Sequence, residues 1–197
     1  MVTGNDNELW VGSYGNGIFR YNTKNDALEL QIKAKNGLAS NWIRSITMDK
    51  NANLWTTSKK GVSKLSFSDP KSSHSYLIKK ITTRNGLPTN IINCISEDDE
   101  GNIWFGTDGK GLLKSTNPAF TLFTVEDGIG SNHIMTLLED KNNKLLMGTY
   151  DKGIHFHDNN YKKPITTKSG LSNNTVWCSL KDNKNNLWFG TSNGLTK

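Results

Sequence analysis

The chain has 197 residues, of which 18 are Gly and only 34% are hydrophobic, a composition that suits many short strands joined by tight turns. Its formal net charge of +6 comes from scattered lysines rather than a basic block, so we expect a solvated surface and no nucleic-acid binding. No apolar run approaches the roughly 20 residues of a membrane span, so we expect no membrane contact from this segment.

Related segments recur four times along the chain, and each contains the pattern Gly-x-x-x-Asn. They cover residues 36–43, 85–92, 127–134 and 169–176, with glycines at positions 37, 86, 128 and 170. The spacings between these glycines are therefore 49, 42 and 42 residues. A repeat of about 42 residues with several short strands is typical of β-propeller blades.

The same succession of residues follows each opening segment. An aspartate comes first, at position 49, 98, 140 or 182. A strand follows, and one position of it is occupied by tryptophan in most units. We call this position the tryptophan column; its residues are Trp10, Trp55, Trp104 and Trp188, with Leu146 in the remaining unit. A second glycine lies six or seven residues later, at position 17, 61, 111, 153 or 194.

Four strands per unit are predicted, and the unit that begins at residue 85 shows them most clearly. We expect strand one at 92–97, strand two at 102–107, strand three after Gly111 and strand four at 120–125. Asp98 begins the first hairpin, where its carboxylate can accept hydrogen bonds from backbone N–H groups two residues on. The sequence therefore predicts an all-β fold, built from propeller blades of four antiparallel strands.

We interpret the chain as one partial propeller domain, 1–197. Its repeat units are predicted at about 1–35, 36–84, 85–126, 127–168 and 169–197, with the first and last units partial. The chain is expected to enter at strand two of a blade, at Leu9-Trp10, and to leave after strand three of another. Because both ends then carry the same strands, we expect an open arc or partial propeller rather than a closed ring.

The recurring residues are interpreted as structural. A column filled four times by Trp and once by Leu indicates packing, with the rings wedged between neighbouring blades. The repeated Asn41, Asn90, Asn132 and Asn174 are expected to cap the turn into strand one. Gly101 is expected to adopt a positive φ that Asn tolerates in other units, whereas Ala52 at the same position is unexplained.

The two cysteines are predicted to be free and largely buried thiols. Cys94 and Cys178 occupy the same position in units two repeats apart, with Thr136 at the matching position between them. The Cα atoms of a disulfide lie within about 7 Å of each other, which is closer than two strands separated by a whole blade.

The pattern Gly-Leu-x-x-Asn-x-Ile, then Glu-Asp-x-x-Gly-Asn-Ile-Trp-Phe-Gly-Thr, then Gly-Leu-x-Lys resembles the two-component regulator propeller repeat. Residues 85–114 carry the best match and residues 169–197 nearly as good a one. The resemblance implies the periplasmic sensor region of a hybrid two-component system of the Bacteroidetes type, in a larger membrane-anchored protein. It also implies recognition of oligosaccharides from glycan breakdown, and it supplies no catalytic residues.

No catalytic residue, metal site or cofactor is expected, and we predict that the chain is not an enzyme. The sequence contains no nucleophile elbow and no phosphate-binding loop. His155 and His157 are two apart on a predicted strand and therefore share a face. Apart from Asp151 and Asp158, no cysteine or acidic partner lies nearby at a repeat-equivalent position, so a metal site is disfavoured.

Residues that the repeat does not demand are the candidates for ligand binding. In propellers the loop before strand one and the loop between strands two and three share one face. Bulky or charged residues at variable positions of these loops are Trp42, Arg44, His133 and Trp177 in the first set, and Tyr14, Lys59, Asp108 and Tyr150 in the second. Aromatic faces with a few polar groups suit a sugar, although Trp42 and Trp177 could instead fill gaps between inner strands.

Three functions therefore remain open. The chain could be a ligand-sensing fragment that binds oligosaccharides. It could be a structural blade set that docks neighbouring blades or a homodimer partner, without a small ligand. A propeller lyase or glycosidase is the third alternative, and it requires a converging acid pair or a Tyr/His cluster that the sequence does not offer.

Overall fold

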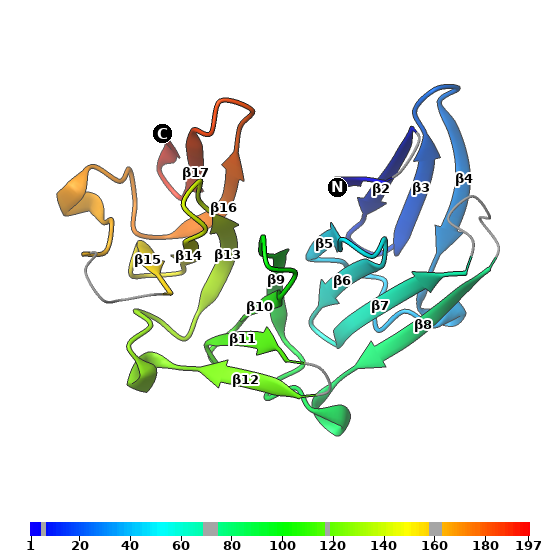
Figure 1. Ribbon diagram of the computed structural model, residues 1–197, viewed down its shortest axis with the longest axis horizontal. Coiled ribbons are helices and arrows are strands. Elements are labelled where there is room, and N and C mark those ends of the chain that lie inside the picture. Colours follow the sequence, from blue (N-terminus) through cyan, green and yellow to red (C-terminus); the bar gives the residue numbers. More distant parts are fainter. Residues whose placement is uncertain (5–6, 69–74, 117–118, 158–162) are drawn as a thin grey trace. The chain divides into compact units, whose positions relative to one another are not determined.

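A computed structural model describes residues 1–4, 7–68, 75–116, 119–157 and 163–197. Their strands form five sheets, and in each sheet the strands lie side by side in chain order (Figure 1). Three sheets have four strands and two have three, and the strand pairs are antiparallel hairpins. The all-β fold and its antiparallel blades are confirmed. Among the described residues, the fourth sheet has three strands instead of the four predicted, and the fifth has the three expected of a partial unit.

The chain divides into two compact units, Met1–Ile95 and Ser96–Lys197, which are described separately. The first sheet of unit 1 contains strands β1 to β4, at Val2–Thr3, Glu8–Gly12, Ile18–Asn22 and Ala27–Ile32. Its second sheet contains β5 to β8, at Ser45–Met48, Leu54–Ser58, Gly61–Phe67 and Tyr76–Ile81.

The third sheet begins at the end of unit 1 and continues in unit 2. It contains β9 to β12, at Ile92–Glu97, Ile103–Thr107, Leu112–Ser115 and Phe120–Phe123. The fourth sheet contains β13 to β15, at Ile134–Glu139, Leu145–Thr149 and Ile154–Phe156. The fifth contains β16 to β18, at Val176–Lys181, Leu187–Thr191 and Gly194–Thr196.

Three details of the strand prediction are wrong. The first sheet does not start at strand two, because Val2–Thr3 forms β1 and pairs with β2, with Val2 opposite Trp10. In the third sheet strand four ends at Phe123, because Thr124 caps a 3₁₀ turn through its hydroxyl, which accepts from the Glu126 N–H. Among the described residues of the fourth sheet, a single bridge between Ile154 and Ile165 stands in place of a fourth strand.

A 3₁₀ turn precedes strand one of each of the last four sheets. The turns η1 to η4 run Ala34–Asn36, Thr83–Asn85, Val125–Asp127 and Thr167–Ser169, and each ends at a glycine with positive φ. The repeated asparagine closes this turn as predicted, since Asn41 Oδ1 accepts from the Ala34 N–H at 2.7 Å and Asn132 Oδ1 from the Val125 N–H at 3.0 Å. The glycine of the repeat is therefore needed to reverse the chain before strand one.

The same asparagines also join adjacent sheets through their backbone. In unit 1 the Gly17 N–H donates to the Asn41 carbonyl at 2.9 Å, and in unit 2 the Gly111 N–H donates to the Asn132 carbonyl at 2.9 Å. Gly17 and Gly111 belong to the loop between strands two and three of one sheet, whereas the asparagines precede strand one of the next. One residue per repeat thus holds both its own turn and the neighbouring sheet.

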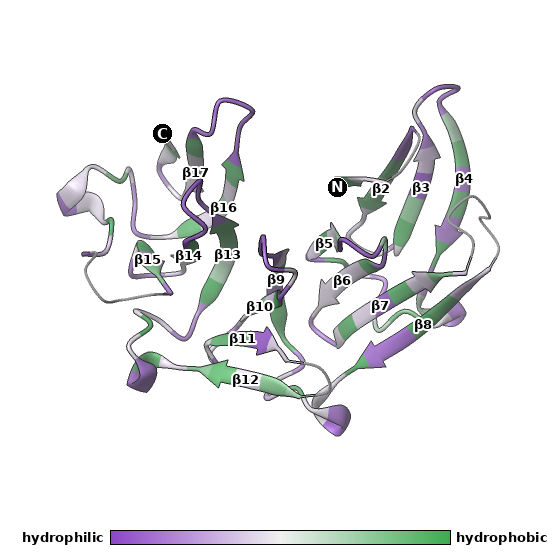
Figure 2. Ribbon diagram, viewed as in Figure 1, coloured by the Kyte–Doolittle hydropathy of each residue, from purple (hydrophilic) through white to green (hydrophobic). Residues whose placement is uncertain are grey.

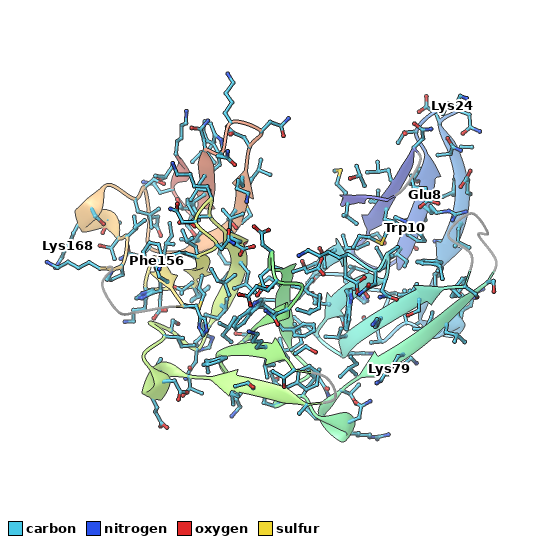
Figure 3. All side chains as sticks on the ribbon, in the orientation of Figure 1. Glu8, Trp10, Lys24, Lys79, Phe156 and Lys168 are labelled. Atoms are coloured by element: carbon cyan, nitrogen blue, oxygen red, sulfur yellow. The ribbon has the colours of Figure 1, made fainter. Side chains whose placement is uncertain are left out.

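The core of each unit lies between sheets, as the repeated tryptophan predicted. In unit 1, Trp10 is 1% exposed and its ring lies 5.5 Å from that of Phe67 in the next sheet (Figure 3). In unit 2, Trp104 is also buried, and its ring lies 4.7 Å from His157 in the next sheet. Strands carry most of the hydrophobic residues, while the turns that join them are hydrophilic (Figure 2).

In three sheets the tryptophan of the column forms an arrangement with an aspartate and a cation, and neither partner of the ring was predicted from the sequence. The indoles of Trp55, Trp104 and Trp188 donate from Nε1 to the hairpin aspartate, at 2.8, 2.7 and 2.9 Å. A cation also lies over each ring of the column, and these cations are Arg20, Lys64, Lys114 and Lys197.

The fourth sheet lacks this arrangement altogether. Leu146 replaces the tryptophan, and its cross-strand partner is Phe156, at the register position where Trp104 faces Lys114. Leu146 and Phe156 join Val176 and Phe189 in the core of unit 2. The loss of the indole is therefore matched by loss of the cation, and an apolar pair fills the space.

The hairpin turn after the aspartate requires a positive φ in every repeat that contains it. Gly101 has φ 87°, Asn143 59° and Asn185 60°, as expected. Ala52 has the same conformation, with φ 57°. The Asp49 carboxylate accepts from the N–H groups of Asn51 and Asn53, and these bonds hold the turn despite the alanine.

The cysteine prediction is correct for one residue and wrong in part for the other. Both Cys94 and Cys178 are free. Cys94 is buried, as expected, but Cys178 is exposed. The shared repeat position did not determine burial, because the two strands have different neighbours.

Candidate functional site

The candidate residues of unit 1 lie together. Tyr14, from the loop after β2, forms a backbone bridge with Trp42, which precedes β5. Their rings meet edge to face, with centroids 4.2 Å apart at 89°. Tyr14 is 73% exposed and Trp42 is 49% exposed. The bond between the Gly15 N–H and the Asn41 carbonyl, 3.1 Å long, holds the two loops in this position.

Arg44 and Lys59 stand beside this aromatic pair. Together with Tyr14, Trp42, Ser40 and Lys60 they line a cavity of about 290 Å³, which we call the unit 1 pocket. The Arg44 N–H donates to the Thr57 carbonyl at 2.9 Å, and its guanidinium donates from Nη1 to Asn93 Oδ1. Sequence reasoning missed Ser40 and Lys60, although Lys60 directly follows a predicted residue.

The candidate residues of unit 2 form a row along neighbouring elements. Asp108 and His133 are joined by a backbone bridge, and His133 Nδ1 lies 2.9 Å from Asp108 Oδ1. This is the same relation between adjacent sheets as that of Tyr14 and Trp42 in unit 1. The row continues within the fourth sheet, because the Tyr150 N–H donates to the His133 carbonyl at 3.1 Å.

A second aromatic pair ends this row. The rings of Tyr150 and Trp177 meet edge to face, with centroids 5.7 Å apart at 79°. Trp177 is 47% exposed, and its indole donates from Nε1 to Ser192 Oγ at 2.8 Å. Ser192 occupies the same loop position as Tyr14 and Lys59, and that position was the signal that could have identified it.

Trp177 and Trp42 are not equivalent in the repeat. Trp42 directly follows the repeated asparagine, whereas Trp177 lies three residues after Asn174, where the second sheet has Arg44. Both rings are about half exposed. Trp42 lies in the loop before β5, whereas Trp177 is the second residue of β16, and each ring leaves an aromatic face exposed.

His155 has a structural environment. Its ring Nε2 lies 3.0 Å from the Lys152 carbonyl oxygen, and a side chain at Gly130 would collide with the ring. Burial lowers the pKa of His155 below its ordinary value. In the part of the chain that the structure describes, no group of three or more His, Cys, Asp or Glu side chains is arranged to hold a metal ion.

A second cavity, of about 270 Å³, lies in unit 2 beside the hairpin between β9 and β10. Its acidic residues are engaged in the turns of the repeat. Asp98 accepts from Trp104, and Glu139 Oε2 accepts from the Asp99 N–H at 2.8 Å. Burial raises the pKa of Glu139. These contacts assign the cavity to the packing of the third and fourth sheets.

Residues 86–109 and 170–193 match the two component regulator propeller family. The chain therefore carries two-component regulator propeller repeats, at the two places where the sequence pattern is fullest. No curated protein matches the chain. Within the described residues, no helix has the length and apolar character that a membrane crossing needs.

Solved structures share the fold. The chain is 23% identical to the extracellular domain of a protein from B. thetaiotaomicron described as a hybrid two component system, with a TM-score of 0.81. This match covers 98% of the chain and 26% of that protein. A second B. thetaiotaomicron extracellular domain, described as a one component system, is 23% identical with a TM-score of 0.73, covering 96% of the chain and 25% of that protein.

A propeller enzyme is also similar in fold. Virginiamycin B lyase from Staphylococcus aureus is 16% identical, with a TM-score of 0.69, and the match covers 99% of the chain and 67% of the lyase. All three likenesses establish the β-propeller fold. The chain spans about a quarter of the length of the two extracellular domains.

Proposed function

We propose that this chain, which carries two-component regulator propeller repeats, is a ligand-binding segment of a periplasmic sensor ectodomain. In this proposal it belongs to a larger membrane-anchored protein and recognises oligosaccharides derived from glycans. The repeat match and the fold shared with two extracellular domains of B. thetaiotaomicron support the sensor assignment.

One observation supports the choice of ligand. Each unit presents an exposed edge-to-face aromatic pair, Tyr14 with Trp42 in unit 1 and Tyr150 with Trp177 in unit 2. Large aromatic side chains that remain about half exposed are not required by the fold. Exposed rings beside polar groups suit a sugar, which offers apolar C–H patches ringed by hydroxyls.

Calorimetric titration of the 197-residue chain with a panel of neutral and acidic oligosaccharides tests this proposal. We expect at least one oligosaccharide to bind, and Trp42→Ala or Trp177→Ala to weaken that binding. Leu77→Ala is the control, because Leu77 is an exposed apolar side chain on β8 and 78% exposed. Absence of binding across the panel, or equal loss in the control, would contradict the proposal.

A second candidate, docking of a further blade or a second copy of the chain, is favoured by the fifth sheet. The residue after the second glycine is at most 1% exposed in four sheets, where it is Ile18, Val62, Leu112 or Ile154. Its counterpart Leu195 is 64% exposed, and Leu180 on the same sheet is 63% exposed. Apolar surface of this kind favours contact with another sheet.

Sedimentation velocity as a function of concentration tests the docking candidate. We expect the chain to self-associate, and Leu195→Asp to shift the distribution towards the monomer. Leu77→Asp serves as the control for added charge at an exposed leucine. A chain that remains monomeric at every concentration would argue against self-docking of this sheet.

A further inference from the structure

We infer that the unit 1 pocket takes a sugar residue that carries an anionic group, a carboxylate or a sulfate. This inference rests on the proposed function, because it specifies the ligand of a site proposed there. It follows from the charge of the pocket, the positioning of Arg44 and the volume of the pocket.

The charge of the pocket is entirely positive. Arg44, Lys59 and Lys60 are among its six lining residues, and none of the six is acidic. In the described part of the chain, no carboxylate lies within ion-pair distance of these three side chains. Three cations beside each other repel, so the pocket favours an anion that neutralises them.

Arg44 is positioned for this task. Its backbone N–H is held by the Thr57 carbonyl, and its guanidinium is oriented by the side chain of Asn93, which is 7% exposed. A guanidinium has five N–H donors, so one bond to an amide oxygen orients it and leaves donors for a ligand. The planar fork of arginine matches the two oxygens of a carboxylate or sulfate.

The corresponding positions of unit 2 carry less of this charge. Lys60 has counterparts in Lys110 and Lys152, which also directly precede the second glycine of their repeats, but Arg44 and Lys59 have no cationic counterpart there. Asp108 occupies the loop position of Lys59, and it is paired with His133 at 2.9 Å. Tyr150 occupies the same position in the fourth sheet. Arg44 and Lys59 are therefore not features of the repeat, and they distinguish this pocket from the row in unit 2.

The size of the pocket limits the ligand. A volume of about 290 Å³ lies at the small end of ligand pockets, which hold roughly 300–1,000 Å³. The pocket accommodates a short stretch of a sugar chain, with the rest outside it. A sugar ring that packs against Trp42 and Tyr14 has Arg44, Lys59 and Lys60 in the same pocket to meet its exocyclic acid group.

Matched disaccharides test the inference by calorimetry on the 197-residue chain. The probes are glucuronosyl-glucose, cellobiose sulfate, neutral cellobiose and inorganic sulfate. We expect the two acidic disaccharides to bind roughly tenfold more tightly than cellobiose at low salt. The advantage should shrink as sodium chloride is raised, because the charges are exposed and screened.

A charge-matched pair of double variants locates the effect. Lys59→Gln with Lys60→Gln should remove most of the acidic preference, weakening the acidic disaccharides by roughly fivefold or more. Lys79→Gln with Lys80→Gln removes two adjacent exposed lysines from β8 and should leave the preference intact (Figure 3 labels Lys79). Circular dichroism of both variants checks that they fold.

Each outcome separates the inference from the proposed function. If cellobiose binds as tightly as the acidic disaccharides, or if the two double variants behave alike, the inference is overturned and sugar binding stands. Inorganic sulfate binding as tightly as cellobiose sulfate overturns it too, because the pocket is then an ion site. If no disaccharide binds and the oligosaccharide panel also shows no binding, the proposed function fails as well.

Discussion

The indole Nε1 of Trp104 donates a hydrogen bond to Asp98 Oδ2 at 2.7 Å. The same carboxylate accepts from the backbone and side chain of Asn102, which closes the hairpin between β9 and β10. One carboxylate therefore joins the local turn of a repeat to the ring that packs against the next sheet. Lys114 lies over that ring from the adjacent strand, 5.1 Å from the ring centroid.

Replacing Trp104 is expected to lower stability strongly. Trp104→Ala empties a buried site between two sheets and removes a donor from Asp98, so we expect a loss of about 3–5 kcal/mol in urea unfolding. Trp42→Ala is the matched control, because that ring is about half exposed and should cost under about 1.5 kcal/mol. A loss below about 1 kcal/mol for Trp104→Ala would show that the tryptophan column is not core.

Acid should destabilise the protein partly through Asp98. Burial raises the pKa of this carboxyl, but the hydrogen bonds from Trp104 and Asn102 lower it, and the effects that lower it together outweigh burial. The pKa of Asp98 therefore lies below its ordinary value of 3.8. A carboxyl whose pKa is lower in the folded state than in the unfolded state stabilises the fold at pH values above its unfolded-state pKa, about 3.9. This stabilisation is lost as the pH falls through the folded-state pKa.

The Asp98→Asn variant tests that pH dependence. It should be less stable than the parent at pH 7, and the difference should narrow as the pH falls below about 4. The measurement is urea unfolding at a series of pH values. A stability difference that is constant over this range would show that the Asp98 carboxylate is not preferentially ionised in the folded state.

Gly111 and Gly194 occupy the same position in different repeats and should tolerate alanine differently. Both have positive φ, 86° and 103°. A Cβ on Gly111 would collide with the Phe123 carbonyl oxygen, whereas one on Gly194 would meet nothing within 4 Å. We expect Gly111→Ala to cost more than about 3 kcal/mol and Gly194→Ala about 1–2 kcal/mol in thermal or urea unfolding. Equal costs would mean that backbone conformation alone explains the repeated glycine.

The two thiols should differ in reactivity. Cys178 is exposed and Cys94 is buried, so a thiol reagent should label one cysteine rapidly in the native protein and both after denaturation without reductant. Peptide mass mapping identifies the labelled residue. Rapid labelling of Cys94, or no free thiol in the denatured protein, would contradict the structure.

Much of the fold could be predicted from the sequence because it depends on local preferences. The glycines of the repeat are needed where the backbone has positive φ, and the alternating strands follow from side chains that point to opposite faces. The predicted strand at 92–97 coincides with β9, Ile92–Glu97. The turn-closing role of Asn41 and its counterparts was also visible, because an asparagine that recurs at one position points to a fixed backbone partner.

The candidate site was predictable in its members but not in its geometry. Subtracting the repeat selected Tyr14, Trp42, Arg44 and Lys59, which the structure brings to one pocket. Only the tertiary structure decided that Tyr14 meets Trp42 across two adjacent sheets, since these residues come from different repeats. It also decided that Lys60 completes the pocket.

The sequence by itself determined the repeat, the strands and the turns, because backbone conformation follows from neighbouring residues. The tertiary structure decided which side chains meet between sheets, because such contacts join residues of different repeats, as the ring contact of Trp104 with His157 does. It alone showed that Leu146 is matched by Phe156 and that Cys178 is exposed while Cys94 is buried. Equivalent positions in a repeat share a backbone but not their neighbours, and burial and charge pairing depend on the neighbours.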